Sequence, residues 1–276
     1  MSNTSSISKS KITSLAIGGF DGIHKAHQEL IKRLDENGTL MIVSKYGSNL
    51  TPKEYRCRFV DRSCFFYDLE KIKDFNCKEF ADFLKEEFPA LKKIVVGYDF
   101  RYGKDRSCSP QDLKKYFRVE VVNEYKLEGV SVHSGVIREL LKNGDIKKAN
   151  KLLCRFYSIE GKVVHGQGIG GKELIPTLNV VVKDFLLPKN GVYATKTKVD
   201  EKLYNSVTFI GIRETTDGEF SVETHILDRY IECKSETLEI LFVDRIRDNQ
   251  KFSSLDELRT AIEKDIKRAK EILDEY

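Results

Sequence analysis

Residues 14–34 read SLAIGGFDGIHKAHQELIKRL, and this segment gives the clearest local signal in the first half of the chain. Its first four residues, 14–17, are mostly apolar and favour a short buried strand. The glycines that follow indicate a tight turn, and residues 27–34 carry apolar side chains on one helical face. A strand, a glycine-rich turn and a helix in this order predict one unit of an α/β fold.

The same alternation continues through the first half of the chain. Further strands are predicted for TLMIV, KKIVVG and RVEVV, which are residues 39–43, 92–97 and 118–122. Helices are predicted for residues 78–88 and 134–144. This order predicts a parallel sheet with helices on its faces, and ligands of such sheets bind at the carboxyl ends of the strands. Residues 18–28 and 97–103 directly follow strands, so we expect both segments at that edge.

The second half has a different pattern. Six strand-like segments are separated mostly by turn signals such as Asp217-Gly218, and they cover residues 158–166, 177–182, 191–199, 205–212, 221–228 and 236–246. Closely spaced short strands predict a small antiparallel barrel. A last helix is predicted from Ser254 to about Leu273, because Ser254 and Glu257 form a capping box. We place the domain boundary between residues 156 and 157.

Composition narrows the class of protein. A length of 276 residues suggests two domains, and 40% hydrophobic with 33% charged residues is typical of globular proteins. The net charge of +4 is spread along the chain, so it does not predict a nucleic-acid partner.

Six irregularly spaced cysteines without a C-x-x-C pair predict reduced thiols and no zinc ribbon. The polar N-terminus and the lack of a long apolar run predict a cytoplasmic protein without a membrane partner. The sequence leaves the oligomeric state open.

Two of the five histidines, His24 and His27, lie three residues apart beside the first glycine-rich turn. On the first turn of a helix they share a face, and two imidazoles beside a helix N-terminus can donate hydrogen bonds to phosphate oxygens. A histidine pair of this spacing is, by itself, more often a helix cap or a surface feature. The pair alone therefore leaves both interpretations open.

The surrounding residues favour the phosphate interpretation. GGFDGIHKAHQELI resembles the H-x-G-H motif of the nucleotidyltransferase superfamily, in particular the adenylyltransferase half of the bacterial bifunctional riboflavin kinase/FMN adenylyltransferase (FAD synthetase) family. Later segments are similar to segments of that family in the same order: VVGYDFRYGKDRS at 95–107, VHSGVIRELL at 132–141, PTLN at 176–179, SVETHILD at 221–228 and KFSSLDELRTAIEKDIKRA at 251–269. The resemblance spans about residues 14 to 270.

This resemblance implies a fold and two reactions. The implied fold is a nucleotidyltransferase-like α/β domain with a Rossmann-like parallel sheet at 1–156. A riboflavin kinase domain, a six-stranded antiparallel β-barrel with a C-terminal helix, follows at 157–276. The implied chemistry is phosphorylation of riboflavin by ATP to give FMN, followed by adenylylation of FMN to give FAD and pyrophosphate. Mg2+ is the implied metal, and the implied partners are small-molecule substrates.

The resemblance also assigns residues to the kinase site. Glu223 matches the catalytic base, and strand alternation puts it on the same side as His225. Thr177 and Asn179 match the ligands of magnesium, and Asn179 also those of the phosphate. Gly161, Gly166 and Lys172 of the glycine-rich segment 161–172 match phosphate-binding positions. The family arginine in this loop is replaced by Gly171, and the neighbouring lysine does not supply a bidentate fork.

In the adenylyltransferase half, His24 and His27 match the phosphate-contacting catalytic histidines. The nucleotide- and flavin-binding positions matched are Gly18, Phe20, Asp21, Asp99, Phe100, Arg101 and Arg138. The chain departs from the family at Ala26, where the motif has glycine, and at Gly135, where the S-S-T triplet has threonine. The alternative is therefore a riboflavin kinase with a degenerate adenylyltransferase domain. A non-catalytic flavin- or nucleotide-binding protein is disfavoured because Glu223, Thr177 and Asn179 are all retained.

Overall fold

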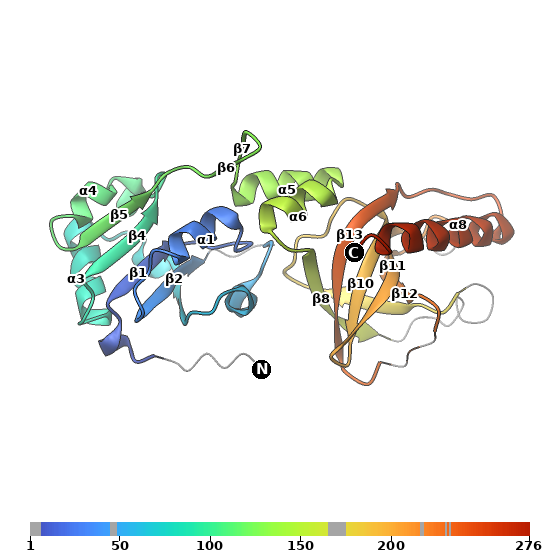
Figure 1. Ribbon diagram of the computed structural model, residues 1–276, viewed down its shortest axis with the longest axis horizontal. Helices are drawn as coiled ribbons and strands as arrows, with labels where there is room; N and C mark the ends of the chain where they lie inside the picture. The colour runs from blue at the N-terminus through green and yellow to red at the C-terminus, as the bar shows by residue number, and fades with distance from the viewer. Residues whose placement is uncertain (1–6, 45–48, 165–174, 216–217, 230, 232) are drawn as a thin grey trace. The chain divides into compact units, whose positions relative to one another are not determined.

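The computed structural model describes residues 7–44, 49–164, 175–215, 218–229, 231 and 233–276. Its chain forms two compact units, residues 1–134 and 135–276 (Figure 1). Each unit has its own sheet and its own core, and we describe them one at a time.

The first unit contains a five-stranded parallel sheet, as predicted. The strands lie in the order β3-β2-β1-β4-β5, with bounds β1 Ser14–Gly18, β2 Gly38–Ser44, β3 Cys64–Asp68, β4 Lys93–Gly97 and β5 Arg118–Val122. Sequence patterning predicted four of these strands and missed β3. This strand lies at the edge of the sheet and has no fully buried residue, so its composition carries no alternation of buried and exposed positions.

Helices cover both faces of this sheet (Figure 1). On β1, Leu15 and Ile17 belong to the core that includes α3 (Cys77–Glu87), whereas Ala16 belongs to the core that includes α1 (Lys25–Ile31). The remaining short elements are the α-helices α2 (Leu69–Ile72) and α4 (Pro110–Leu113), the strands β6 (Lys126–Leu127) and β7 (Val130–Ser131), and the 3-10 turns η1 (Lys9–Lys11), η2 (Lys53–Phe59) and η3 (Lys104–Arg106). Ligands of sheets that are covered on both faces bind at the carboxyl ends of the strands, so the residues that follow β1 and β4 are the place to look for a site.

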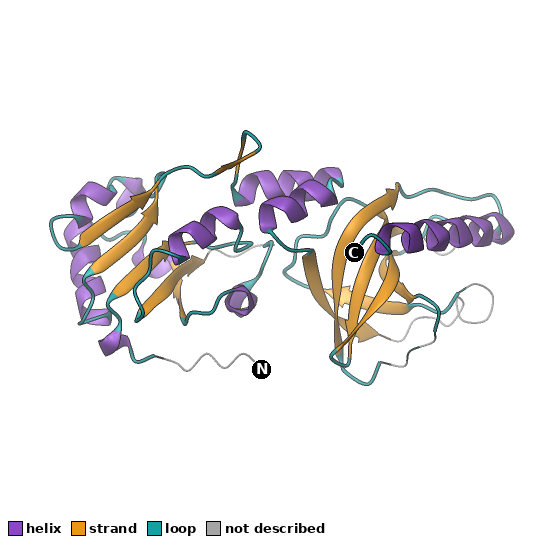
Figure 2. Cartoon of the chain, in the orientation of Figure 1, coloured by secondary structure: helices purple, strands orange, loops and turns teal. Residues whose placement is uncertain are grey.

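The second unit contains a closed antiparallel barrel in the order β10-β11-β12-β9-β8-β13 (Figure 2). Its strands are β8 Tyr157–Val164, β9 Leu178–Val182, β10 Gly191–Val199, β11 Lys202–Ile212, β12 Phe220–Ile226 and β13 Thr237–Arg247. Each of the six predicted segments is a strand, so the predicted six-stranded barrel is confirmed. The cause is regular alternation, since Val222, Thr224 and Ile226 are buried while the residues between them are not.

Among the described residues, three helices accompany the barrel: α5 (Ser134–Asn143), α6 (Ile146–Leu153) and α8 (Leu255–Leu273). The predicted start of α8 is confirmed, because the Ser254 side chain accepts a hydrogen bond from the Glu257 backbone N–H. The end of α8 places Ala269, Ile272 and Leu273 in one core with barrel residues. In the portion of the chain that the structure describes, no helix combines the length and the apolar character needed to cross a membrane.

The interior of the barrel contains a closed ring of five hydroxyl groups. Thr195 contacts Ser206 at 2.7 Å and Thr208 at 2.8 Å; Thr197 contacts Ser206 at 2.7 Å and Thr224 at 3.0 Å; Thr208 donates to Thr224 at 3.0 Å. All five side chains are fully buried. A hydroxyl has one proton to donate, so a ring in which each group donates once and accepts once satisfies every donor. The ring connects three neighbouring strands, β10, β11 and β12.

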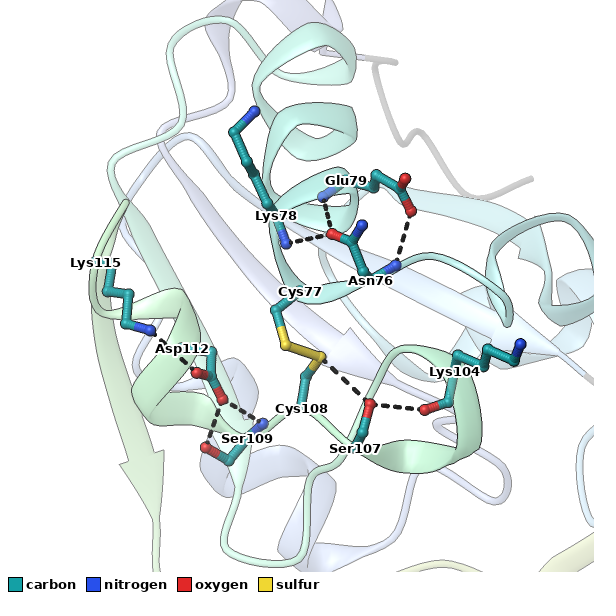
Figure 3. The surroundings of a disulfide bond; sticks show 10 residues. All are labelled: Asn76, Cys77, Lys78, Glu79, Lys104, Ser107, Cys108, Ser109, Asp112 and Lys115. Carbon is teal, nitrogen blue, oxygen red and sulfur yellow. Dashed lines mark hydrogen bonds and ion pairs between the residues drawn. A yellow bond between two sulfur atoms is a disulfide. The ribbon is translucent and has the colours of Figure 1, made fainter.

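The cysteine prediction is wrong for one pair. Cys77 at the start of α3 and Cys108 form a disulfide, with Cα atoms 5.7 Å apart and a sequence separation of 31 (Figure 3). The spacing gave no signal, because the two residues meet only after the segment that follows β4 folds back onto α3. The backbone N–H of Lys104 donates to the Phe75 carbonyl at 2.9 Å, which holds the two segments together beside the disulfide.

Candidate functional site

On the outer face of the barrel, the predicted kinase residues come together. Asn179 on β9 and Glu223 on β12 are register partners, so their side chains project from the same face of the sheet. Thr177 precedes β9, and its Oγ1 lies 3.5 Å from Glu223 Oε2. His225 lies on the same face, and its Nδ1 is 2.8 Å from the Pro176 carbonyl. The predicted shared face of Glu223 and His225 is therefore confirmed.

The second oxygen of the carboxylate has a partner that the sequence did not reveal. Arg213, directly after β11, places Nη1 3.2 Å from Oε1 of Glu223. The two side chains are mostly buried, with 25% and 19% of their surface exposed. Arg213 lies outside the segments that the sequence analysis matched, and its position ten residues before Glu223 does not by itself indicate a contact. Only the pairing of β11 with β12 brings them together.

These side chains offer oxygen donors of the kind that magnesium prefers: a hydroxyl, an amide and a carboxylate. Over the described parts of the chain, no cluster of three or more His, Cys, Asp and Glu side chains is arranged to hold a metal ion. Magnesium is commonly bound through one or two protein oxygens together with substrate phosphates. The face that carries Thr177, Asn179 and Glu223 fits that mode of binding.

The glycine-rich segment is only partly described. Gly161 lies within β8, and a Cβ atom at this position would come 2.5 Å from Val180 Cγ1, so glycine is what lets β8 lie close to β9. Gly166 and Lys172 lie outside the described residues. The segment leaves β8 at Val164, which is the register partner of Asn179. The glycine-rich segment therefore starts next to the Thr177–Asn179 pair.

In the first unit, His24 is the N-cap of α1. Its Nδ1 accepts a hydrogen bond from the His27 backbone N–H at 3.4 Å, so we assign the ring proton to Nε2. The His24 and His27 rings are stacked, with centroids 3.6 Å apart and planes inclined by 16°. The helix-cap interpretation is therefore confirmed for His24, and the pair lies after the carboxyl end of β1; phosphate binding by the two imidazoles stays a prediction.

The turn before these histidines has an unusual backbone. Phe20 and Ile23 have φ angles of 50° and 40°, in the left-handed region that side chains of this size disfavour, and Gly22 has a φ of 88°. The Phe20 ring is buried, and its centroid lies 5.0 Å from that of His27. Such strain persists where the surroundings hold the backbone, and it is frequent at binding sites.

The side chain of Asp21 is buried and forms hydrogen bonds with backbone groups of the protein. Its carboxylate accepts hydrogen bonds from the backbone N–H groups of Leu50 at 3.2 Å and Thr51 at 3.0 Å. The buried Arg56 supports the same turn, because its Nη1 donates to the Gly19 carbonyl at 2.8 Å. Sequence reasoning did not identify Arg56. These contacts make Asp21 and Arg56 part of the framework that shapes the histidine turn.

The second predicted segment of this unit follows β4, which pairs directly with β1. Asp99 lies at this edge, and its Oδ1 would be 3.1 Å from a Cβ atom on Gly97, so glycine gives the carboxylate room. Phe100 packs partly against the core, and Arg101 is exposed. Tyr102 closes the segment through two backbone hydrogen bonds with Cys108, of 3.1 and 3.0 Å. Burial raises the pKa of Tyr102 to about 12, so its hydroxyl stays neutral at physiological pH.

His133 and Ser134, where α5 begins, reach the same edge. Ser134 Oγ donates to the Asp21 carbonyl at 2.7 Å, and His133 Nε2 lies 3.0 Å from the Tyr98 hydroxyl. A Cβ atom on Gly135 would have no neighbour within 4 Å. Arg138 lies on α5 within the second compact unit. The structure therefore brings together the histidine turn, the Asp99 segment and Ser134 in the first unit.

Comparison with known proteins gives consistent matches. The family model described as riboflavin kinase matches residues 153–273. The bifunctional riboflavin kinase/FMN adenylyltransferase of Haemophilus influenzae is 32% identical over 288 residues, which are 93% of this chain and 92% of that protein. The proteins of the same name from Bacillus subtilis and Pseudomonas fluorescens are 30% and 29% identical, and the matches cover 92% of this chain with 90% and 91% of theirs.

Among the solved structures that match, one covers nearly the whole chain. It is the crystal structure described as a macrolide-efflux protein from Streptococcus pneumoniae, with a TM-score of 0.83 and 27% sequence identity. The match covers 98% of this chain and 97% of that one. The arrangement of a parallel sheet followed by a barrel and a helix is therefore shared over nearly the full length of both chains.

Proposed function

Since this chain belongs to the family of bifunctional riboflavin kinases/FMN adenylyltransferases, we propose that it makes FMN from riboflavin and then FAD from FMN, with one ATP consumed in each reaction. The observation that carries the proposal is the similarity of this chain to the Haemophilus influenzae protein. The two are 32% identical over 93% of this chain and 92% of that protein, so the match includes both halves of this chain. Riboflavin, FMN and ATP are the substrates that this activity requires. We further propose that it acts in the cytoplasm on these small molecules, with no nucleic-acid or membrane partner.

We assign the two reactions to the two halves of the chain. Residues 1–156 carry adenylyl transfer, and residues 157–276 carry riboflavin phosphorylation. The riboflavin kinase model begins at residue 153, close to this limit. The helices α5 and α6 connect the two halves, and they pack with the barrel: the Asn150 amide donates to the Phe242 carbonyl at 2.8 Å.

In the kinase reaction, the ribityl 5′-hydroxyl of riboflavin attacks the γ-phosphorus of ATP. The new O–P bond forms while the bond from that phosphorus to the β-γ bridging oxygen breaks, and ADP leaves. Glu223 accepts the hydroxyl proton as general base. Its Oε2 faces Thr177, on the face of the sheet where Asn179 also lies, so the base and the phosphate ligands stand side by side.

Thr177 and Asn179 are proposed to hold Mg2+ together with ATP phosphates, and Asn179 also contacts the phosphate directly. When bound, Mg2+ supplies neutralisation of the phosphate charge. The glycine-rich segment is proposed to cover the phosphates through Gly166 and Lys172, with Gly161 in the strand that leads into it. Loops of this kind bind phosphate through backbone N–H groups.

In the second reaction, a phosphate oxygen of FMN attacks the α-phosphorus of ATP, and pyrophosphate leaves as the bond to the α-β bridging oxygen breaks. The nucleophile is already ionised, so positioning and charge neutralisation dominate. His24 and His27 donate to the phosphate oxygens. The remaining proposed nucleotide- and flavin-binding residues are Gly18, Phe20, Asp21, Asp99, Phe100, Arg101 and Arg138. Phe20 and Asp21 contribute by shaping the turn, since both side chains are buried.

The kinase-only alternative rests on Ala26 and Gly135. The space beside Gly135 is open, and Ser134 still reaches the histidine turn through the Asp21 carbonyl. The relatives that match both halves favour the two-reaction proposal.

A chromatographic product assay tests the proposal. The protein receives ATP and Mg2+ with either riboflavin or FMN; we expect FMN and FAD from riboflavin, and FAD from FMN. The Glu223→Gln variant should lose at least about 100-fold in riboflavin phosphorylation, because the amide cannot accept the proton. FMN that stays unconverted in the wild type would support the kinase-only alternative. Near-normal riboflavin phosphorylation by the variant would remove Glu223 as the base.

A further inference from the structure

Arg213 contacts the proposed general base and has no role in the reactions as described so far. It lies directly after β11, and its Nη1 is 3.2 Å from Oε1 of Glu223. Only a quarter of the arginine side chain and a fifth of the glutamate side chain are exposed. Ion pairs on a fully exposed surface contribute little, but this pair is mostly shielded from water and lies among the proposed catalytic groups.

The backbone around Arg213 is held from both sides. Its N–H donates to the Glu219 carbonyl at 2.9 Å, and its own carbonyl accepts from the Gly218 N–H at 3.1 Å. These two bonds close the turn between β11 and β12. The preceding residue is held as well, because the Asn249 amide donates to the Ile212 carbonyl at 2.8 Å. The backbone that carries the Arg213 side chain is therefore fixed. A fixed backbone reduces the conformational entropy that is lost when the guanidinium pairs with Glu223.

The two oxygens of Glu223 have different surroundings. Oε1 meets the Arg213 guanidinium, and Oε2 lies 3.5 Å from the Thr177 hydroxyl. A carboxylate without the arginine could rotate about its last bond and exchange the two oxygens. With the arginine in place, one oxygen is held and the other is directed to the face that carries Thr177 and Asn179.

From this geometry we infer that Arg213 is a positioning residue for riboflavin phosphorylation: it holds Oε1 of Glu223 so that Oε2 receives the proton of the attacking hydroxyl. The inference rests on the proposed kinase function and on Glu223 as its base. The proton moves from the riboflavin hydroxyl to Oε2 as the O–P bond forms and ADP leaves. The guanidinium stays protonated throughout, because arginine does not titrate in this range.

The test is a set of steady-state measurements on Arg213→Met and Arg213→Lys, each in the wild-type and in the Glu223→Gln background. We expect Arg213→Met to lower kcat for riboflavin phosphorylation by about 10- to 100-fold, since misplacing a reacting group has an effect of this size. The KM values for ATP and riboflavin should change by less than about twofold. In the Glu223→Gln background, the same substitution should cause no further loss, because the group that it positions is already disabled.

Arg213→Lys should recover part of kcat, because lysine keeps the charge but lacks the planar fork. The matched control is Arg268→Met. Arg268 pairs with Glu271 on α8 at 2.9 Å, with more than half of its side chain exposed, and its loss should leave kcat unchanged. Thermal unfolding shows whether each variant is folded. If Arg213→Met does not fold, kcat of Arg213→Lys is compared with the wild type in both backgrounds instead.

Two results would overturn the inference. A raised KM for ATP with kcat intact would make Arg213 a direct phosphate ligand. An equal further loss of kcat in the Glu223→Gln background would make its role purely structural. The proposed function fails differently: either the wild type does not phosphorylate riboflavin, or Glu223→Gln retains its rate, whatever Arg213 does.

Discussion

His24 has two roles at the scale of single residues. Its Nδ1 caps α1 and its ring stacks on His27 at 3.6 Å. The cap leaves Nε2 as the protonated nitrogen, so the neutral ring can act as a donor without an added proton. The Nε2 hydrogen of His24 is the donor that we propose for a phosphate oxygen.

His27→Ala should lower the rate of FAD formation from FMN by about 100-fold or more, because a donor aimed at developing charge is worth that much. FMN formation from riboflavin should stay within about twofold, since the proposed kinase groups are on the barrel. Separate assays with FMN and with riboflavin measure the two effects. Equal loss of both activities would show that the two sites are not independent.

His24 needs a different substitution, because alanine would also remove the helix cap at a cost of about 1 kcal/mol. His24→Asn keeps a good N-cap residue and removes the imidazole. We expect it to unfold at the same urea midpoint as the wild type while FAD formation falls as for His27→Ala. A variant that is equally stable and fully active would limit His24 to its capping role.

At the scale of elements, the hydroxyl ring connects β10, β11 and β12, and β12 carries Glu223. Thr197→Val keeps the shape of the side chain but leaves Ser206 and Thr224 with one partner fewer. We expect a loss of about 1–3 kcal/mol in the free energy of unfolding, which is the cost of an unsatisfied buried group. Urea unfolding followed by circular dichroism measures it.

Thr237→Val is the matched control, because Thr237 begins β13 and is exposed. Its effect should stay within about 0.5 kcal/mol. If the two variants are equally stable, the buried ring contributes no more than a solvated hydroxyl does.

The disulfide Cys77–Cys108 ties α3 to the segment that follows β4, which includes Asp99. The two cysteines have a sequence separation of 31, and closing a loop of this size is expected to stabilise the fold by about 3.5–4 kcal/mol. The Cys77→Ser/Cys108→Ser variant should therefore unfold at lower urea concentration than the wild type in non-reducing buffer. With dithiothreitol the difference should vanish. If dithiothreitol does not change the urea midpoint of the wild type, the disulfide is not present in solution.

At the scale of the whole molecule, the proposed reactions use separate groups in separate halves of the chain. A mixture of His27→Ala and Glu223→Gln should therefore convert riboflavin to FAD, although neither variant does so alone. The first variant supplies FMN and the second adenylylates it. Chromatography of the flavins over time measures the products. No FAD from the mixture, with both single activities intact, would mean that FMN does not pass through solution.

Local pattern was sufficient for most of the architecture. Short strand-like segments, most of them separated by turn signals, predicted all six barrel strands, apolar runs predicted four of the five sheet strands, and S-x-x-E predicted the start of α8. These predictions hold because each depends on residues that are close together in sequence. A strand buries alternate residues, and a helix is capped by residues within its first turn. The edge strand β3 was missed because it buries no residue fully.

The sequence by itself also determined which residues share a strand face, such as Glu223 with His225, and which motifs follow a strand end. Only the tertiary structure decided that Glu223 faces Arg213, that Cys77 meets Cys108, and that Asp21 holds the backbone of Leu50 and Thr51. Each of these contacts joins segments whose separation is set by strand order, register or loop closure. Such contacts depend on how the whole chain packs, and no local pattern of residues encodes them.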